Sequence, residues 1–426
     1  MSVEKGIKDW LCRLFPSWYD FFMRLTVPAN YDLEILPQLK DAGAFEIYGK
    51  LPFDSVGGGR PSFMATRLSK KGLAEYIRAV HAAGLEFNYL LNAACFGNEE
   101  WTPRFHRQLE SLLGWLDDLK VETLTITAPY LVQIVKKRWP RFKVKVGIYA
   151  QVDTVKRARY WEDLGADAIN LESFSINRDF EKLSAIRQAV KADLVLIANH
   201  FCQPNCPYQI QHQNGHAHAS VTNPKFYIDY PIIQCQKNRL THKELFISAG
   251  WIRPEDTSRY EKIGYTTFKL LERNIPSYAL VQRAQAYHDR RWEGNLADLL
   301  LSWGFQKPAP RFERWWWLKT FRFWKMPLGL SGSALKFLKN QGIFFAQEKN
   351  PIHIDSRKIP DNFLDHFEKT SCLDKECAKC GYCQRIADKA VSIDPAFLKD
   401  ILPVYDQLEG QLVGGQAWGL SPRFHE

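Results

Sequence analysis

The chain of 426 residues carries 57 lysine and arginine residues against 47 aspartate and glutamate residues, a formal net charge of +10, and 46% of it is hydrophobic. This composition is too apolar for a disordered chain, and no collagen-like repeat or coiled-coil heptad runs through it. The sequence shows neither a signal-peptide pattern nor the run of about 20 apolar residues that crosses a membrane, so we expect a cytoplasmic protein without a transmembrane segment.

Short apolar runs dominate the chain between residues 25 and 273. They recur at roughly 20 to 40 residues, and helix-like stretches separate most of them. Eight or nine strand–helix units in about 250 residues favour an α/β fold, a (β/α)8 TIM-like barrel over residues 25–275. The runs lie at residues 25–29, 44–48, 86–91, 123–127, 144–149, 166–171, 193–198, 245–249 and 266–271.

Three further segments flank this predicted barrel. We expect a helical segment at residues 1–24, a helical connector at 276–340 and a small cysteine-rich domain at 341–426. Within the connector, residues 307–339 hold eight basic residues and one acid, with aromatic residues interleaved. Residues 311–325 therefore predict a basic aromatic helix that contacts tRNA, rRNA or a membrane surface, or that packs on the barrel.

A first group of cysteines follows the predicted strands. Cys202 and Cys206 come directly after the seventh run, Cys235 lies in a later segment, and Cys95 follows the third run. The C-terminal ends of barrel strands meet at one mouth, so these thiols can share a metal centre there. Thiolate ligands favour a [4Fe–4S] cluster, with zinc and nearby histidines as the rival set.

A second group is Cys372, Cys377, Cys380 and Cys383, four cysteines within a dozen residues. In a chain without an export signal, such spacing indicates metal ligation rather than disulfides. We predict a second [4Fe–4S] cluster or, alternatively, a zinc ion at these C-terminal cysteines.

Acidic and basic residues also follow the predicted strands. Glu172, Arg178, His200, Arg253 and Lys269 all lie near the ends of apolar runs. Each alone is more often a helix cap or a surface ion pair than a catalytic group. Together they predict a set that orients a polar or anionic substrate, or moves protons, at the barrel mouth.

Several stretches of the barrel resemble the peptidase U32 family. They are ESFSINRDFEKL at residues 172–183, NHFCQPNCPYQIQH at 199–212, WIRPED at 251–256 and TTFKLLER at 266–273, together with Cys235 and Tyr260. The WIRPED stretch indicates one clade of that family. The sequence differs from that of the better known family members at one place. Where they have a long signature with several glycines and cysteines, this chain has SFSIN at residues 173–177.

The resemblance implies two competing activities. The family name implies collagenase-like proteolysis, whereas several members look like iron–sulfur proteins that hydroxylate tRNA, ribosomal RNA or a quinone precursor without dioxygen. The sequence holds no HExxH or GxSxG element, but it holds enough thiols for two clusters. We therefore predict an oxygen-independent iron–sulfur hydroxylase acting on an RNA base or on an aromatic or quinone-type small molecule.

This prediction includes an electron-donor protein as a partner. A U32-type peptidase is the alternative. An accessory protein that binds RNA or a membrane surface is the third possibility.

Overall fold

The computed structural model describes residues 23–62, 65–66, 68–221, 228–273, 275–301, 350–373 and 375–420. The predicted helix at 1–24 and the basic segment at 311–325 lie outside these residues, apart from the last two positions of the former. None of the helices in the described ranges combines the length and the apolar character needed to cross a membrane.

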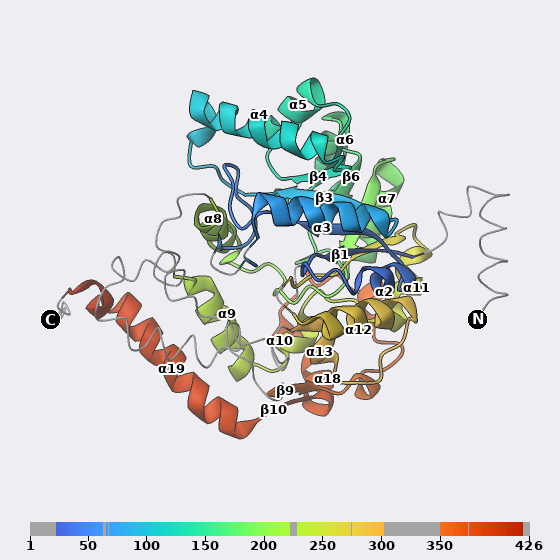
Figure 1. The fold of residues 1–426 in the computed structure, drawn as a ribbon. Coiled ribbons are helices and arrows are strands. Elements are labelled where there is room, and N and C mark those ends of the chain that lie inside the picture. Colours follow the sequence, from blue (N-terminus) through green and yellow to red (C-terminus); the bar gives the residue numbers. More distant parts are fainter. Residues whose placement is uncertain are drawn as a thin grey trace.

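Eight parallel strands form a closed barrel in sequence order, which confirms the predicted (β/α)8 fold (Figure 1). The ring closes because β8 pairs with both β7 and β1. The strands are β1 (Arg24–Pro28), β2 (Ala44–Gly49), β3 (Glu86–Leu91), β4 (Thr123–Ile126), β5 (Lys143–Val146), β6 (Ala168–Asn170), β7 (Asp193–Ile197) and β8 (Thr267–Lys269).

Amphipathic helices connect the strands and cover the outside of the barrel. In α3 (Lys70–Ala82), Ser69 caps the first turn by accepting the Gly72 N–H, and Leu73 and Ile77 are fully buried. The other connecting helices are α2 (Leu36–Asp41), α4 (Pro103–Asp118), α5 (Pro129–Arg138), α6 (Val155–Asp163) and α7 (Phe180–Ala189).

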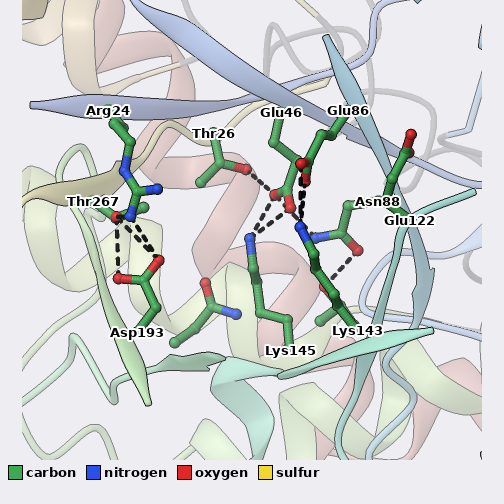
Figure 2. Close-up of polar contacts among 12 residues, drawn as sticks. Arg24, Thr26, Glu46, Glu86, Asn88, Glu122, Lys143, Lys145, Asp193 and Thr267 are labelled. Carbon is green, nitrogen blue, oxygen red and sulfur yellow. Dashed lines mark hydrogen bonds and ion pairs between the residues drawn. The ribbon is translucent and has the colours of Figure 1, made fainter. Parts of the chain in front are cut away.

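A buried polar network crosses the interior of the barrel (Figure 2). Lys145 Nζ lies 2.7 Å from both carboxylate oxygens of Glu46, which also accepts hydrogen bonds from Thr26 at 2.5 Å and Asn88 at 3.0 Å. Burial raises the pKa of Glu46, but Lys145 and the hydrogen bonds from Thr26 and Asn88 together outweigh this effect, and the pKa lies below its ordinary value. The ion pair and its hydrogen bonds therefore connect four strands.

The connection from β7 to β8 is long and helical. It contains α8 (Gln209–Ala219), α9 (Tyr230–Thr241), α10 (Leu245–Ser248) and α11 (Thr257–Glu261). The strand predicted at 245–249 is wrong, because this run forms α10 and buries Phe246 and Ile247. A short buried apolar run has no periodicity that separates strand from helix. The eighth barrel strand comes from the last run instead.

The C-terminal part packs on the barrel. It follows α12 (Ser277–His288) and α13 (Leu296–Leu300) and comprises β9 (Ile352–Ile354), α16 (Asp365–Lys369), α17 (Cys377–Cys380), α18 (Tyr382–Ala390), β10 (Val391–Ile393) and α19 (Pro395–Val413). Strands β9 and β10 pair antiparallel. Its apolar side chains belong to the same buried cluster as those of the barrel, and Figure 1 shows α19 running beside α9.

Short 3-10 turns complete the described structure. They lie at Glu99–Trp101, Ile148–Ala150, Pro254–Asp256, Ser356–Lys358 and Gln416–Trp418.

Candidate active site at the barrel mouth

A cavity of about 360 Å³ lies where the barrel strands end. Tyr48 from β2, Ile197 and Asn199 at the end of β7, and Lys269 from β8 form its inner wall. Residues of α8 and α9 line it from the side of the long β7–β8 connection. This is the end of the barrel at which the active sites of such folds lie, and the volume suits a ligand of small-molecule size.

Three of the predicted thiols line this cavity. Cys202 and Cys206 lie on the loop after β7, and Cys235 lies on α9. Burial raises the pKa of the Cys202 thiol, and the nearby Cys235 raises it further, while the Arg239 guanidinium opposes both effects. The structure thus brings together a thiol pair from one loop and a third thiol from a helix some thirty residues on.

The three sulfur atoms do not converge on one point. Among the described residues, no set of three cysteines has its sulfur atoms within 4.8 Å of one another. A single tetrahedral ion at about 2.3 Å from each sulfur would need a closer set, whereas a multi-iron cluster gives each thiolate its own iron. The described side chains therefore hold no preformed three-thiol site for a single ion.

Cys95 stands apart from this group. It lies in the loop after β3, where its sulfur accepts the Gly97 N–H at 3.4 Å, and it does not line the cavity. Its predicted role as a fourth ligand stays a prediction.

Lys269 is the predicted catalytic residue whose surroundings are most unusual. Its Nζ lies 4.0 Å from the centre of the Tyr48 ring, on the cavity wall. Burial and then the positive charge of Lys145 lower the pKa of Lys269 to about 7. An amine with this pKa exchanges protons near neutral pH and can serve as a general base or acid.

His200 also lines the cavity, next to the thiol loop. Its Nδ1 contacts the Ser173 hydroxyl, and the Phe174 ring lies 4.4 Å away. Burial, together with Arg239, lowers the pKa of His200 to about 3, so the imidazole is neutral. A neutral ring can donate or accept one hydrogen bond toward a ligand.

Glu172 lies just behind this wall. Its carboxylate accepts the Phe174 N–H at 2.7 Å and both the N–H and the hydroxyl of Ser175, at 2.9 Å and 2.6 Å. Burial raises the pKa of Glu172. The carboxylate thus holds the loop after β6 and does not line the cavity.

Arg178 lies outside the cavity and joins the barrel to the C-terminal part. It donates to the carbonyls of Ile247 at 2.6 Å and Trp251 at 3.1 Å. Its guanidinium lies over the rings of Trp251, Phe363 and Phe367 at 4.4, 4.8 and 5.0 Å. These contacts indicate a positioning role rather than substrate contact.

Arg253 occupies a similar position. It pairs with Asp256 at 2.8 Å and donates to the carbonyls of Ile359 and Pro360 at 3.1 and 3.2 Å. The arginine of the WIRPED stretch therefore anchors residues 359–360 on the barrel, away from the residues that line the cavity.

The four C-terminal cysteines lie close enough to interact. Burial raises the pKa of Cys383 to about 11, Arg178 opposes the shift, and Cys372, Cys377 and Cys380 add to it. His366 is a neighbour of this group that the sequence analysis missed. Its Nε2 lies 3.6 Å from the Cys380 sulfur. This group is separate from the cavity.

Three arginines line the cavity that the sequence analysis did not predict as site residues, namely Arg60, Arg239 and Arg273. Arg60 pairs with Glu272 at 2.6 Å, and both residues line the cavity with Arg273. Burial and then Arg60 lower the pKa of Arg273, which indicates concentrated positive charge. Glu272 and Arg273 directly follow the last predicted strand, so their position alone could have indicated them.

The glycine-rich loop before Arg60 forms part of the same wall. The Gly57 N–H is bonded to Asp54 at 2.7 Å, the Gly58 N–H to Ser220 at 2.6 Å and the Gly59 N–H to Asn92 at 3.3 Å. The protein's own side chains thus occupy the backbone donors that a phosphate would need.

Comparisons with known proteins relate part of the chain to one family. Residues 37–201 match the family model of peptidase family U32. An uncharacterized protease of Methanocaldococcus jannaschii is 28% identical over 350 residues, which cover 82% of this chain and 90% of that protein. A solved U32 peptidase structure shares 21% identity with a TM-score of 0.46, over 59% of this chain and 93% of that chain. The chain is thus similar to peptidase family U32 over residues 37–201 and to the Methanocaldococcus jannaschii protein over most of its length.

Proposed function

We propose that this chain is an iron–sulfur enzyme that hydroxylates a planar ring without dioxygen. The ring would be an RNA base or an aromatic or quinone-type small molecule. The observation that carries the proposal is that Cys202, Cys206 and Cys235 line one cavity together with Lys269. Ionisable groups with strongly perturbed pKa values that line a cavity mark a candidate functional site.

The residues of the cavity fit a thiolate-held cluster. Cys202, Cys206 and Cys235 would hold it, and Arg239 would balance part of its negative charge, because this guanidinium already opposes the raised pKa of both Cys202 and Cys235. When bound, the cluster would supply one-electron transfer. Hydroxylation of a C–H bond with water as the oxygen source releases two protons and two electrons, so a partner redox protein must accept these two electrons.

The protein's own groups supply proton transfer and binding. Lys269, with a pKa of about 7, takes up a proton from the reacting ring or from the attacking oxygen donor. Arg60 and Arg273 offer positive charge to an anionic group of the substrate. Phe174 and Leu301 line the cavity with apolar surface, which packs on the ring and displaces water.

Purification without air tests the proposal. We expect a broad visible absorption and about eight iron atoms per chain if both cysteine groups hold four-iron clusters. The Cys202→Ser, Cys206→Ser double variant should lose about four of them, and Cys95→Ser should lower the same iron content if Cys95 is the fourth ligand. Mass spectrometry of tRNA, rRNA and aromatic acids from a deletion strain would then distinguish the two substrate classes.

One result would overturn the proposal. Zinc in both cysteine groups, with no iron bound after anaerobic reconstitution, would exclude the cluster. Because the proposed reaction releases electrons, it needs an electron-accepting redox protein in place of the electron-donor protein that the sequence analysis expected. The role of the 311–325 segment stays a prediction, since that segment lies outside the described residues.

Peptide hydrolysis is the second candidate function, because the Methanocaldococcus jannaschii relative is named a protease. The sequence from His212 to His216 is HQNGH on α8, so Gln213 stands where a zinc peptidase motif has its glutamate base. The raised pKa of Cys202 also disfavours a free thiolate nucleophile. Casein turnover that persists in the Cys202→Ser, Cys206→Ser variant would favour the peptidase.

A further inference from the structure

Two histidines and one aspartate converge at the side of the cavity. His212 Nε2 lies 3.0 Å and His216 Nε2 lies 3.1 Å from the same carboxylate oxygen, Oδ2 of Asp229. The three donor atoms all lie within 4.8 Å of one another, and they form the one such group found among the described residues. Both imidazole rings line the cavity.

The local fold explains this convergence. His212 and His216 are four residues apart on α8, so their side chains lie on one face of the helix. Asp229 is the N-cap of α9, and its other oxygen, Oδ1, accepts the Ile232 N–H at 3.2 Å. The cap bond fixes the carboxylate and turns Oδ2 toward α8. Two helices thus hold the three donors.

The spacing of the donors suits a metal ion. Donor atoms about 2.1 Å from one ion and at right angles to each other lie about 3.0 Å apart. Both nitrogen–oxygen distances meet this value. Paired histidines four residues apart on a helix, completed by a carboxylate, are a common ligand set for divalent transition ions.

The surroundings place such an ion in contact with the cavity. Three protein donors leave coordination positions open, and the rings that supply two of them face the cavity. Cys202 and Asp229 both raise the pKa of Tyr149, so the Tyr149 hydroxyl lies near both groups. An ion here would be within reach of a ligand that also contacts the thiol loop.

We infer that His212, His216 and Asp229 bind a divalent first-row transition-metal ion, such as Fe²⁺, Co²⁺ or Zn²⁺. The site uses no cysteine and is independent of the proposed cluster. Its open positions would accept an anionic oxygen of the ligand in the cavity, as a Lewis acid does. The inference does not depend on which reaction the enzyme performs.

Cobalt binding to the full chain tests this inference. The protein is stripped with a chelator and titrated with Co²⁺ without air, and bound metal is counted by elemental analysis. Nitrogen and oxygen ligation gives weak visible bands, whereas thiolate ligation gives strong near-ultraviolet charge transfer, so the two kinds of site are separable. We expect the His212→Ala, His216→Ala variant to bind one equivalent less than the wild type.

Matched variants make the result decisive. Asp229→Asn keeps the cap of α9, because asparagine also caps helices, and should bind this equivalent at least about tenfold more weakly. His218→Ala, at an exposed position of the same helix, should bind like the wild type. The Cys202→Ser, Cys206→Ser variant should keep the equivalent even if it loses the cluster.

The alternative is that the three side chains only hydrogen-bond to one another. Equal cobalt content in the wild type, the double histidine variant and Asp229→Asn would establish that alternative and overturn the inference. Loss of the equivalent in the cysteine variant would also overturn it, because the ion would then depend on thiols.

Discussion

Replacing Lys269 by methionine should stabilise the protein at neutral pH. The pKa of Lys269 is 10.5 in a solvated lysine and about 7 in the folded protein, with burial as the main cause. The difference of about 3.5 between these pKa values corresponds to about 5 kcal/mol of destabilisation when the amine is protonated in both states. Methionine removes this cost and keeps a side chain of similar length.

The number of protons bound by the folded and unfolded chains determines how the stability difference between the two proteins changes with pH. Below pH 7 the folded and unfolded chains both carry the proton, so the cost of Lys269 is complete. From pH 7 to 10.5 the unfolded chain holds more protons than the folded one, and the stability of the wild type rises with pH. The Lys269→Met variant should therefore be more stable by about 4 kcal/mol at pH 7, about 2 at pH 9 and about 1 at pH 10.

Urea unfolding followed by circular dichroism, at one-unit steps from pH 6 to pH 10, measures this difference. Other groups titrate alike in both proteins, so the difference isolates Lys269. Lys71→Met, at an exposed position of α3, controls for the chemical change. A stability difference for Lys269→Met that stays constant across the range would refute a buried amine with a lowered pKa.

Further predictions concern the barrel and its C-terminal attachment. Lys145→Met should destabilise the fold by about 3–5 kcal/mol in urea unfolding, because it leaves Glu46 buried without its partner. Adding Glu46→Gln should recover part of this lost stability. A double variant that is no more stable than Lys145→Met would contradict this explanation. Gly250→Ala should cost at least about 3 kcal/mol, since its Cβ would lie 2.2 Å from a backbone carbonyl oxygen of the β6–α7 loop; wild-type stability would disprove the clash. Arg178→Ala should speed limited proteolysis within residues 350–373 at least about tenfold, and unchanged cleavage would argue for a role in the cavity instead.

The barrel could be predicted from the sequence because its strands are buried on both faces. Runs such as residues 193–198 are almost continuously apolar, and the spacing between them leaves room for one helix. The polar network inside the barrel could not be predicted, because charged residues such as Glu46 and Lys145 are usually exposed. Only the barrel geometry brings these two side chains, from β2 and β5, into contact. The run at 245–249 has the composition of a buried strand, so the sequence could not show that it forms the helix α10 and packs beside α9.

The thiol group of the site could be predicted because cysteine clusters are rare and the barrel topology places them at one end. The roles of the arginines could not. Arg178 and Arg253 follow apolar runs as cavity residues do. Yet the Arg178 guanidinium lies over the rings of Phe363 and Phe367, and Arg253 donates to the carbonyls of residues 359–360. Residues 359–367 lie far from both arginines in the sequence, so no local sequence pattern predicts these contacts. Asp229 escaped notice for the same reason, because its partners lie on another helix.

The charges of the cavity narrow the chemistry that fits it. Arg60, Arg273 and Lys269 face one cavity with Glu272 as their acidic counterpart there, and the pKa values of Arg273 and Lys269 are both lowered by burial first and by neighbouring cations next. Such a site stores unfavourable electrostatic energy that an anion relieves. A peptide bond carries no net charge and offers little relief, whereas a thiolate-held cluster or an anionic substrate does. Binding of an anion should also raise the pKa of Lys269, so near pH 7 the protein should take up protons as the ligand enters.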